Sequence, residues 1–142
     1  MLSSLGHAVS GRFAGILKPL GLEPREFALL LRTSLSQGAT QQAIGEMLGI
    51  PPSRMVALVD SLEERRLLER RMSPSDRRAR ALHLTESGRL LLIEAMTAAA
   101  SLERIVTAGL DEEQRTKLFA MLDLIAANLD IPPGVHGSHT VN

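Results

Sequence analysis

The chain contains no cysteine, tyrosine or tryptophan, and its aromatic residues are three phenylalanines in 142 residues. Without cysteine there can be no disulfide framework, no thiolate zinc site and no cysteine-based redox switch. This composition fits a reducing compartment, and we expect a cytoplasmic protein. Because aromatic residues are so few, leucine, alanine, isoleucine, valine and methionine must fill the interior, which favours helices.

The chain also lacks net charge, since 16 Lys and Arg residues balance 16 Asp and Glu residues. Charged residues interrupt every apolar run within about a dozen positions, which is too short for a membrane span. The N-terminus shows no basic segment followed by an apolar run, so no secretory signal is evident. A hydrophobic fraction of 44% indicates a folded chain, most simply one domain.

Positive charge is nevertheless concentrated in one place. Residues 65–80 hold seven arginines and only two acids, around the turn signal Ser-Pro-Ser-Asp at 73–76. An arginine cluster alone is more often a solvated surface. The secondary structure around it must therefore indicate whether it contacts phosphate. Within a neutral chain, such a segment is a candidate for contact with phosphate.

Helical periodicity accounts for most of the chain. Apolar residues recur at spacings of three and four in segments that proline, glycine or a capping residue delimits. The predicted helices cover about residues 2–20, 24–37, 41–48 after the cap Thr40, a segment opened by Pro52, 86–108 after the cap Thr85, and a last one between Asp111 and Pro132.

The middle of the chain predicts a helix-turn-helix followed by a hairpin. Only Gly49-Ile50-Pro51 separates the helix over 41–48 from the next, which is the spacing of a helix-turn-helix. Residues 67–72 and 79–84 have strand length, and residues 73–78 would join them as an arginine-rich tip. The expected fold is mainly α with a small β-hairpin wing.

This order of elements indicates binding to double-stranded DNA. The second helix of such a pair fits the major groove, where its N-terminal residues reach base edges. The hairpin would carry arginine toward the adjacent minor groove, whose narrow A·T-rich form attracts it.

Several segments resemble the MarR (multiple antibiotic resistance regulator) family of bacterial transcription regulators, over roughly residues 22–130. The wing and the Leu-Thr-Glu-x-Gly signature that follows it are together more specific than the helix-turn-helix alone. The segments that carry the resemblance are TQQAIGEMLG at 40–49, VDSLEER at 59–65, LERR at 68–71, SDRRAR at 75–80 and LTESGR at 84–89.

The resemblance implies a winged helix-turn-helix domain over 22–85 and a helical dimerisation region formed by 1–21 and 86–131. We expect residues 132–142 to be a flexible tail. The implied protein is a homodimeric repressor on a pseudo-palindromic double-stranded operator, answering to a small anionic or aromatic effector. It has no catalytic activity, no cofactor and no membrane partner.

Candidate DNA contacts are carried over residue by residue. Ser53, Arg54 and Ala57 fall on the exposed start of the recognition helix. Thr40 and Gln41 fall where the preceding helix meets the DNA backbone.

The wing contributes the remaining candidates. Arg78 matches the arginine that enters the minor groove, and Asp76 the acid that orients it, because a carboxylate two residues away can hold a guanidinium. Arg77 and Arg80 flank the tip. Arg70 and Arg71, on the first strand, are expected to face the phosphate backbone.

The chain departs from the family pattern at three positions. Ala57 stands where many relatives carry a polar or basic residue, so Arg54 is the candidate for a guanine contact. Pro51 cannot supply the usual side-chain cap. Arg66 replaces a common glycine, so either this position is left-handed and strained or the turn differs.

Other interpretations remain open. A winged helix can serve as a protein–protein interaction module, or bind DNA without control by a ligand. An enzyme is a poorer interpretation, because no nucleophile arrangement is present. His136 and His139 lie in a Gly- and Pro-bearing segment without a nearby acid, which argues against a metal site.

Overall fold

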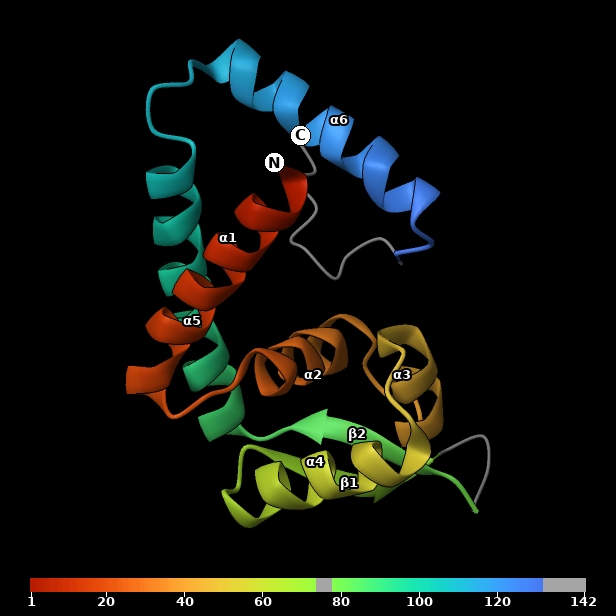
Figure 1. Ribbon diagram of the computed structural model, residues 1–142. Helices are drawn as coiled ribbons and strands as arrows, with labels where there is room; N and C mark the ends of the chain where they lie inside the picture. The colour runs from red at the N-terminus through yellow and green to blue at the C-terminus, as the bar shows by residue number, and fades with distance from the viewer. Residues whose placement is uncertain (74–77, 132–142) are drawn as a thin grey trace.

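The computed structural model describes residues 1–73 and 78–131. It is mainly helical with a two-stranded antiparallel wing, as predicted. Helices α2, α3 and α4 and the hairpin pack together, α1 and α6 lie on the other side of α2, and α5 runs from β2 past α2 and along α1 (Figure 1). The elements are α1 (Leu2–Leu17), the 3-10 turn η1 (Lys18–Leu20), α2 (Pro24–Leu35), α3 (Gln41–Leu48), α4 (Pro52–Glu64), β1 (Leu68–Met72), β2 (Arg80–Leu84), α5 (Glu86–Val106) and α6 (Glu112–Asn128).

Local capping chemistry sets most of these boundaries. The Thr40 hydroxyl accepts a hydrogen bond from the backbone N–H of Ala43 at 3.2 Å, and Gly49 ends α3 with a φ of 63°. Asp111 and Gln114 form a reciprocal capping box at the start of α6. These predicted boundaries are confirmed.

Three helix ends come earlier than predicted, and one of them is that of α2, which ends at Leu35 instead of residue 37. The first helix stops being α-helical at Leu17, because Lys18–Leu20 tightens into a 3-10 turn that Gly21 closes with a φ of 65°. Helix α5 ends at Val106, two residues early. The Thr107 hydroxyl donates back to the carbonyl of Glu103 at 2.8 Å, and Gly109 then takes a φ of 92°.

The hairpin pairs Leu68 with Leu84 and Met72 with Arg80, so each strand begins one residue later than predicted. It is tied to the helices from outside, because the N–H of Leu82 donates to the carbonyl of Ala39 at 3.1 Å. The strands contact α4 through β1 and α2 through β2. Successive side chains of each strand point to opposite faces of the hairpin.

The core is aliphatic, as the shortage of aromatics requires. Phe13 and Phe27 make an edge-to-face contact at 5.3 Å between ring centroids. The remaining core is largely leucine, drawn from every element of the winged part. Its largest fully buried hydrophobic side chains are Leu17, Leu29, Leu30, Ile44, Met55, Val59, Leu62, Leu68 and Leu82.

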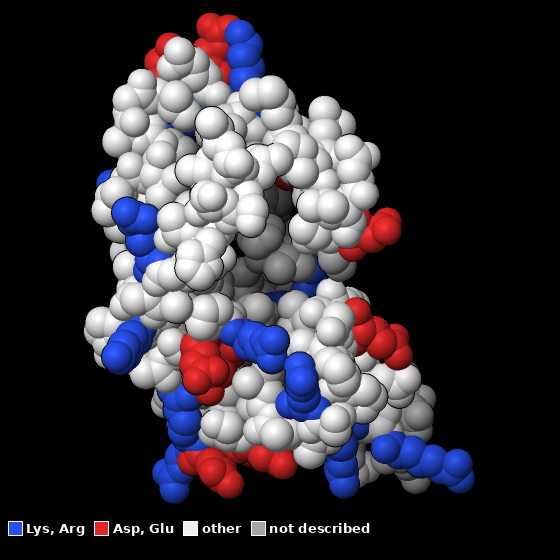
Figure 2. Space-filling view, in the orientation of Figure 1, with Lys and Arg blue, Asp and Glu red and all other residues white. Residues whose placement is uncertain are grey.

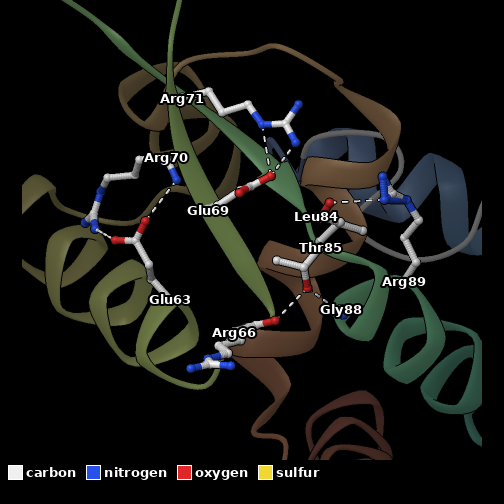
Figure 3. Close-up of polar contacts among 9 residues, drawn as sticks. All are labelled: Glu63, Arg66, Glu69, Arg70, Arg71, Leu84, Thr85, Gly88 and Arg89. Atoms are coloured by element: carbon white, nitrogen blue, oxygen red, sulfur yellow. Dashed lines mark hydrogen bonds and ion pairs between the residues drawn. The ribbon is translucent and has the colours of Figure 1, made fainter.

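The end of α4, the start of β1 and the start of α5 meet at one junction (Figure 3). Arg66 adopts a left-handed φ of 56°, so the first of the two sequence alternatives for this position is correct. The Thr85 hydroxyl donates to the carbonyl of Arg66 at 2.6 Å and accepts from the N–H of Gly88 at 3.0 Å. The N–H of Thr85 donates to the carbonyl of Leu67 at 3.2 Å. The junction thus holds a conformation that costs a non-glycine residue about 1–2 kcal/mol.

The helices α1, α5 and α6 leave much apolar surface exposed. No residue of α6 is buried. Ile105, Leu124 and Leu129 are each more than 60% exposed. Within residues 1–73 and 78–131, no helix is long and apolar enough to span a membrane.

Gly88→Ala should destabilise the fold, because a Cβ there would lie 1.8 Å from the carbonyl oxygen of Leu67. We expect the free energy of unfolding to fall by about 1–3 kcal/mol, the usual range for overpacking. Chemical denaturation at a fixed protein concentration measures this.

Gly45→Ala is the matched control, since its added Cβ meets no atom closer than 3.4 Å. Helix propensity should make that variant neutral or up to about 1 kcal/mol more stable. Equal stability of the two variants would contradict the close packing at Gly88.

Candidate nucleic-acid interface

Helix α4 presents an exposed N-terminal surface. Ser53, Arg54 and Ala57 are exposed, while Met55 and Val59 on the opposite side are buried. Pro51 is the N-cap and gives no side-chain hydrogen bond, so the orphan N–H groups of the first turn rely on other partners. The structure therefore brings the three predicted base-facing residues together on one accessible patch. Their contact with DNA stays a prediction.

Thr40 and Gln41 lie at the start of α3, and both are half-buried. The Thr40 hydroxyl is engaged as the helix cap. The Gln41 side-chain carbonyl accepts a hydrogen bond from Nε of Arg70 at 3.0 Å. Both side chains are thus held in place by protein contacts.

Arg70 makes the densest set of polar contacts in the region. Its Nη1 lies 2.5 Å from Oε2 of Glu63, and its Nη2 lies 2.6 Å from Oδ1 of Asp60. Its backbone N–H also donates to Glu63 at 3.0 Å. The expectation that Arg70 faces phosphate did not anticipate these partners: the guanidinium points toward α4, with 21% of the side chain exposed.

The charge state of Arg70 follows from these contacts. Burial tends to lower the pKa of the guanidinium, but the hydrogen bonds and charges of Asp60 and Glu63 outweigh it, so the pKa is raised above its ordinary value. Arg70 therefore remains a cation balanced by two carboxylates. It links β1, α4 and the start of α3 into one unit.

Arg71 leaves the strand on the opposite side from Arg70, as alternation requires (Figure 3). Its Nε donates to Glu69 at 2.9 Å, and its Nη2 contacts the same carboxylate oxygen. The Arg71 side chain is 59% exposed. Arg71 is thus more accessible than Arg70, but it faces the α2 side of the hairpin.

At the wing tip, Arg78 and Arg80 are exposed. Asp76 and Arg77 lie outside the described residues, so the orienting role of Asp76 stays a prediction. Charged side chains gather over the winged part of the face shown, whereas the part formed by α1 and α6 is mostly uncharged (Figure 2).

The sequence and the fold are similar to those of known regulators. Residues 20–79 match the sequence model of the MarR family. The HTH-type transcriptional regulator MhqR of Bacillus subtilis (strain 168) is 32% identical over 109 residues, which cover 76% of this chain and 74% of MhqR. The chain belongs to the MarR family. This MarR-family protein is therefore a DNA-binding transcription regulator and not an enzyme.

Solved structures agree with that assignment. The transcriptional repressor CouR bound to a 23-mer DNA duplex is 36% identical, with a TM-score of 0.80 over 88% of this chain and 89% of CouR. CouR from Rhodococcus jostii RHA1 bound to p-coumaroyl-CoA is 33% identical, with a TM-score of 0.77 over 89% and 87%. A protein named for regulation of the hcr operon in Thauera aromatica is 29% identical over 102 residues, and this chain spans 61% of its length.

Two sets of partners in this MarR-family fold were not anticipated from the sequence. Asp60 and Glu63 hold Arg70, and the buried Glu26 holds Arg65 at 3.0 Å. Arg65 also donates to the carbonyl of Gly21 at 2.7 Å. The spacing of Asp60 and Glu63 on one helix face was a visible signal. The pairing of Glu26 with a residue 39 positions later had none.

Arg70→Gln and Glu63→Gln should each lower the free energy of unfolding. The double variant should lose less of that free energy than the two single losses added together. Because Glu63 is 39% exposed, solvent screening limits the expected coupling to about 0.5–1 kcal/mol. Urea denaturation of the four proteins measures it.

The more exposed pair Arg71 and Glu69 provides the control cycle, whose coupling should be smaller. Strict additivity at Arg70 and Glu63 would contradict the proposed link. If Arg70→Gln lowers the salt dependence of DNA binding by about one unit, Arg70 is instead a phosphate contact.

Proposed function

We propose that the protein regulates transcription by occupying a pseudo-palindromic operator as a homodimer, with the start of α4 in the major groove and the wing in the minor groove. One observation carries the proposal. The exposed patch of Ser53, Arg54 and Ala57 lies on the helix that packs against an arginine-bearing hairpin. Helix and hairpin thus offer one surface for base edges and one for the neighbouring groove.

Exposed apolar surface supports the homodimer. Leu90, Ile93 and Met96 on α5 are 55%, 60% and 47% exposed, and α6 adds a long apolar surface without a buried residue. Monomeric proteins rarely leave such continuous apolar surface open to water. A second copy can cover the same patch on both subunits, as a two-fold interface requires.

A repressor released by an effector is the regulatory mode we favour. CouR is a repressor with one structure on a DNA duplex and another with p-coumaroyl-CoA, an anionic aromatic thioester. We therefore propose that the effector is an anionic aromatic compound, either a small molecule or a thioester. We further propose that it acts in the cytoplasm. Release requires the ligand to prefer a dimer in which the recognition helices no longer match major grooves about 34–36 Å apart.

A labelled duplex of mixed sequence should bind this protein with an affinity that falls steeply with salt. Each phosphate neutralised contributes a slope of about −0.9 in a plot of log K against log salt. Fluorescence anisotropy at about 50 and 200 mM salt gives the slope. An affinity that does not change with salt concentration, or no binding at all, would favour a protein–protein interaction module instead.

Arg78→Ala and Arg54→Ala should weaken DNA binding in different ways. Removing Arg78 should weaken binding to all duplexes and flatten the salt slope by about one unit. Removing Arg54 should cost about 1–3 kcal/mol on the preferred site and relax preference at one base pair.

Selection of bound duplexes from a random pool identifies that preferred site and its half-site spacing. Each variant serves as the other's control. An equal loss on every sequence for Arg54→Ala would make Arg54 a backbone contact, and unchanged affinity for Arg78→Ala would remove the wing from the mechanism.

A further inference from the structure

Two adjacent glutamines open α3, and their side-chain amides are held in opposite orientations. The side-chain carbonyl of Gln41 accepts a hydrogen bond from Nε of Arg70 at 3.0 Å. The side-chain nitrogen of Gln42 donates instead to Oε1 of Glu46, one turn along the helix, also at 3.0 Å. Gln41 therefore keeps its N–H groups free of its protein partner, whereas Gln42 keeps its carbonyl oxygen free.

The orientation of the Gln41 amide follows from the chemistry of its partner. A guanidinium carries only N–H donors, has no acceptor and stays protonated in proteins, so the amide must turn its carbonyl oxygen toward it. The reverse orientation would place N–H groups of Gln41 against N–H groups of Arg70. On its free side, the Gln41 amide consequently acts as a donor.

Arg70 is itself held firmly enough to impose this orientation. Its Nη1 lies 2.5 Å from Glu63 (Figure 3) and its Nη2 lies 2.6 Å from Asp60, and both acids belong to α4. Each nitrogen of the guanidinium thus already has an acceptor, and 21% of the side chain is exposed. Arg70 is therefore poorly suited to bind phosphate itself and well placed to hold Gln41.

The free donors of Gln41 lie at a helix end that suits an anion. Gln41 is the first residue of α3 and is half-buried, and its Nε2 makes no hydrogen bond within residues 1–73 and 78–131. The N–H groups of a first helical turn lack intrahelical partners and carry partial positive charge. In a helix-turn-helix, the helix before the recognition helix crosses the DNA backbone. A donor at this position can therefore reach a phosphate oxygen.

We propose that Arg70 is a positioning residue, which fixes the Gln41 amide as a hydrogen-bond donor to one phosphate of the DNA backbone. The inference rests on the proposed function, because the phosphate belongs to the bound duplex. Asp60 and Glu63 then support DNA binding through Arg70, although as acids they would repel phosphate directly.

Fluorescence anisotropy with the mixed-sequence duplex and with the duplex obtained by selection tests the contact. Gln41→Ala should weaken binding about two- to tenfold, as expected for the loss of one hydrogen bond. The factor should be equal on both duplexes and the salt slope unchanged, because a neutral amide at a phosphate reads no base and releases no counter-ion. Unchanged affinity, or a loss confined to the preferred duplex, overturns the phosphate contact.

Gln41→Glu is the sharper variant, because a carboxylate keeps the acceptor for Arg70 and removes only the donors. In urea this variant should be no less stable than the wild type. Its DNA affinity should fall further than that of Gln41→Ala, because like charges repel. A Gln41→Glu variant that binds DNA as tightly as the wild type would overturn the proposal.

Gln42→Ala is the matched control on the same helical turn. It should leave the DNA affinity unchanged, because the side-chain nitrogen of Gln42 already donates to Glu46. Equal losses for Gln42→Ala and Gln41→Ala would indicate a general effect on α3 and would refute a specific contact by Gln41.

A double-variant cycle in DNA affinity tests the positioning role of Arg70. If Arg70 acts through Gln41, Gln41→Ala should cost little in a chain that already carries Arg70→Gln, so the two losses should not add. The salt slope of Arg70→Gln should equal that of the wild type. Additive losses, or a slope lowered by about one unit, would remove the positioning role.

NMR on the DNA-free full chain separates this inference from the proposed function. The heteronuclear NOE of the Gln41 side-chain amide should show an ordered group in the wild type and a mobile one in Arg70→Gln. An amide that is equally mobile in both proteins would refute the positioning role even if DNA binds. An ordered amide in a protein that binds neither duplex would refute the operator proposal, and the phosphate contact with it.

Discussion

The capture of the Arg66 and Leu67 carbonyls by Thr85 is the interaction on which the rest of the structure depends. Those two hydrogen bonds hold a left-handed arginine at the end of α4 and bring the first turn of α5 against β1. Gly88 permits this approach because it has no Cβ. The direction of the recognition helix, the start of the wing and the start of the long helix are consequently determined at one point.

From that junction, alternation along a single strand gives two neighbouring arginines different surroundings. Arg70 turns to α4 and binds Asp60 and Glu63, whereas Arg71 leaves the strand on the opposite side and binds Glu69. The two strands contact different helices, since β1 contacts α4 and β2 contacts α2. The wing therefore connects α4, through β1, with α2, through β2.

Much of the fold could be predicted because its signals are local. Thr40, Gly49 and Thr85 act within four residues of the boundaries they set, and the hairpin follows from its turn and its change of period. The partners of Arg70 could not be predicted in the same way, because they depend on how a strand crosses a helix. Periodicity predicts which face of a helix or strand a side chain occupies, but it does not predict which carboxylate of another element lies next to it.

The pairing of arginines changes the meaning of the positive segment at 65–80. Arg65 is held by Glu26 and Arg70 by two acids, so part of that charge is already neutralised inside the protein. Non-specific DNA affinity grows with the number of phosphates that free cations can neutralise. That number is lower than the seven arginines of the segment suggest. Under the proposed function, recognition then depends on a few exposed side chains, among them Arg54 on α4 and Arg78 on the wing.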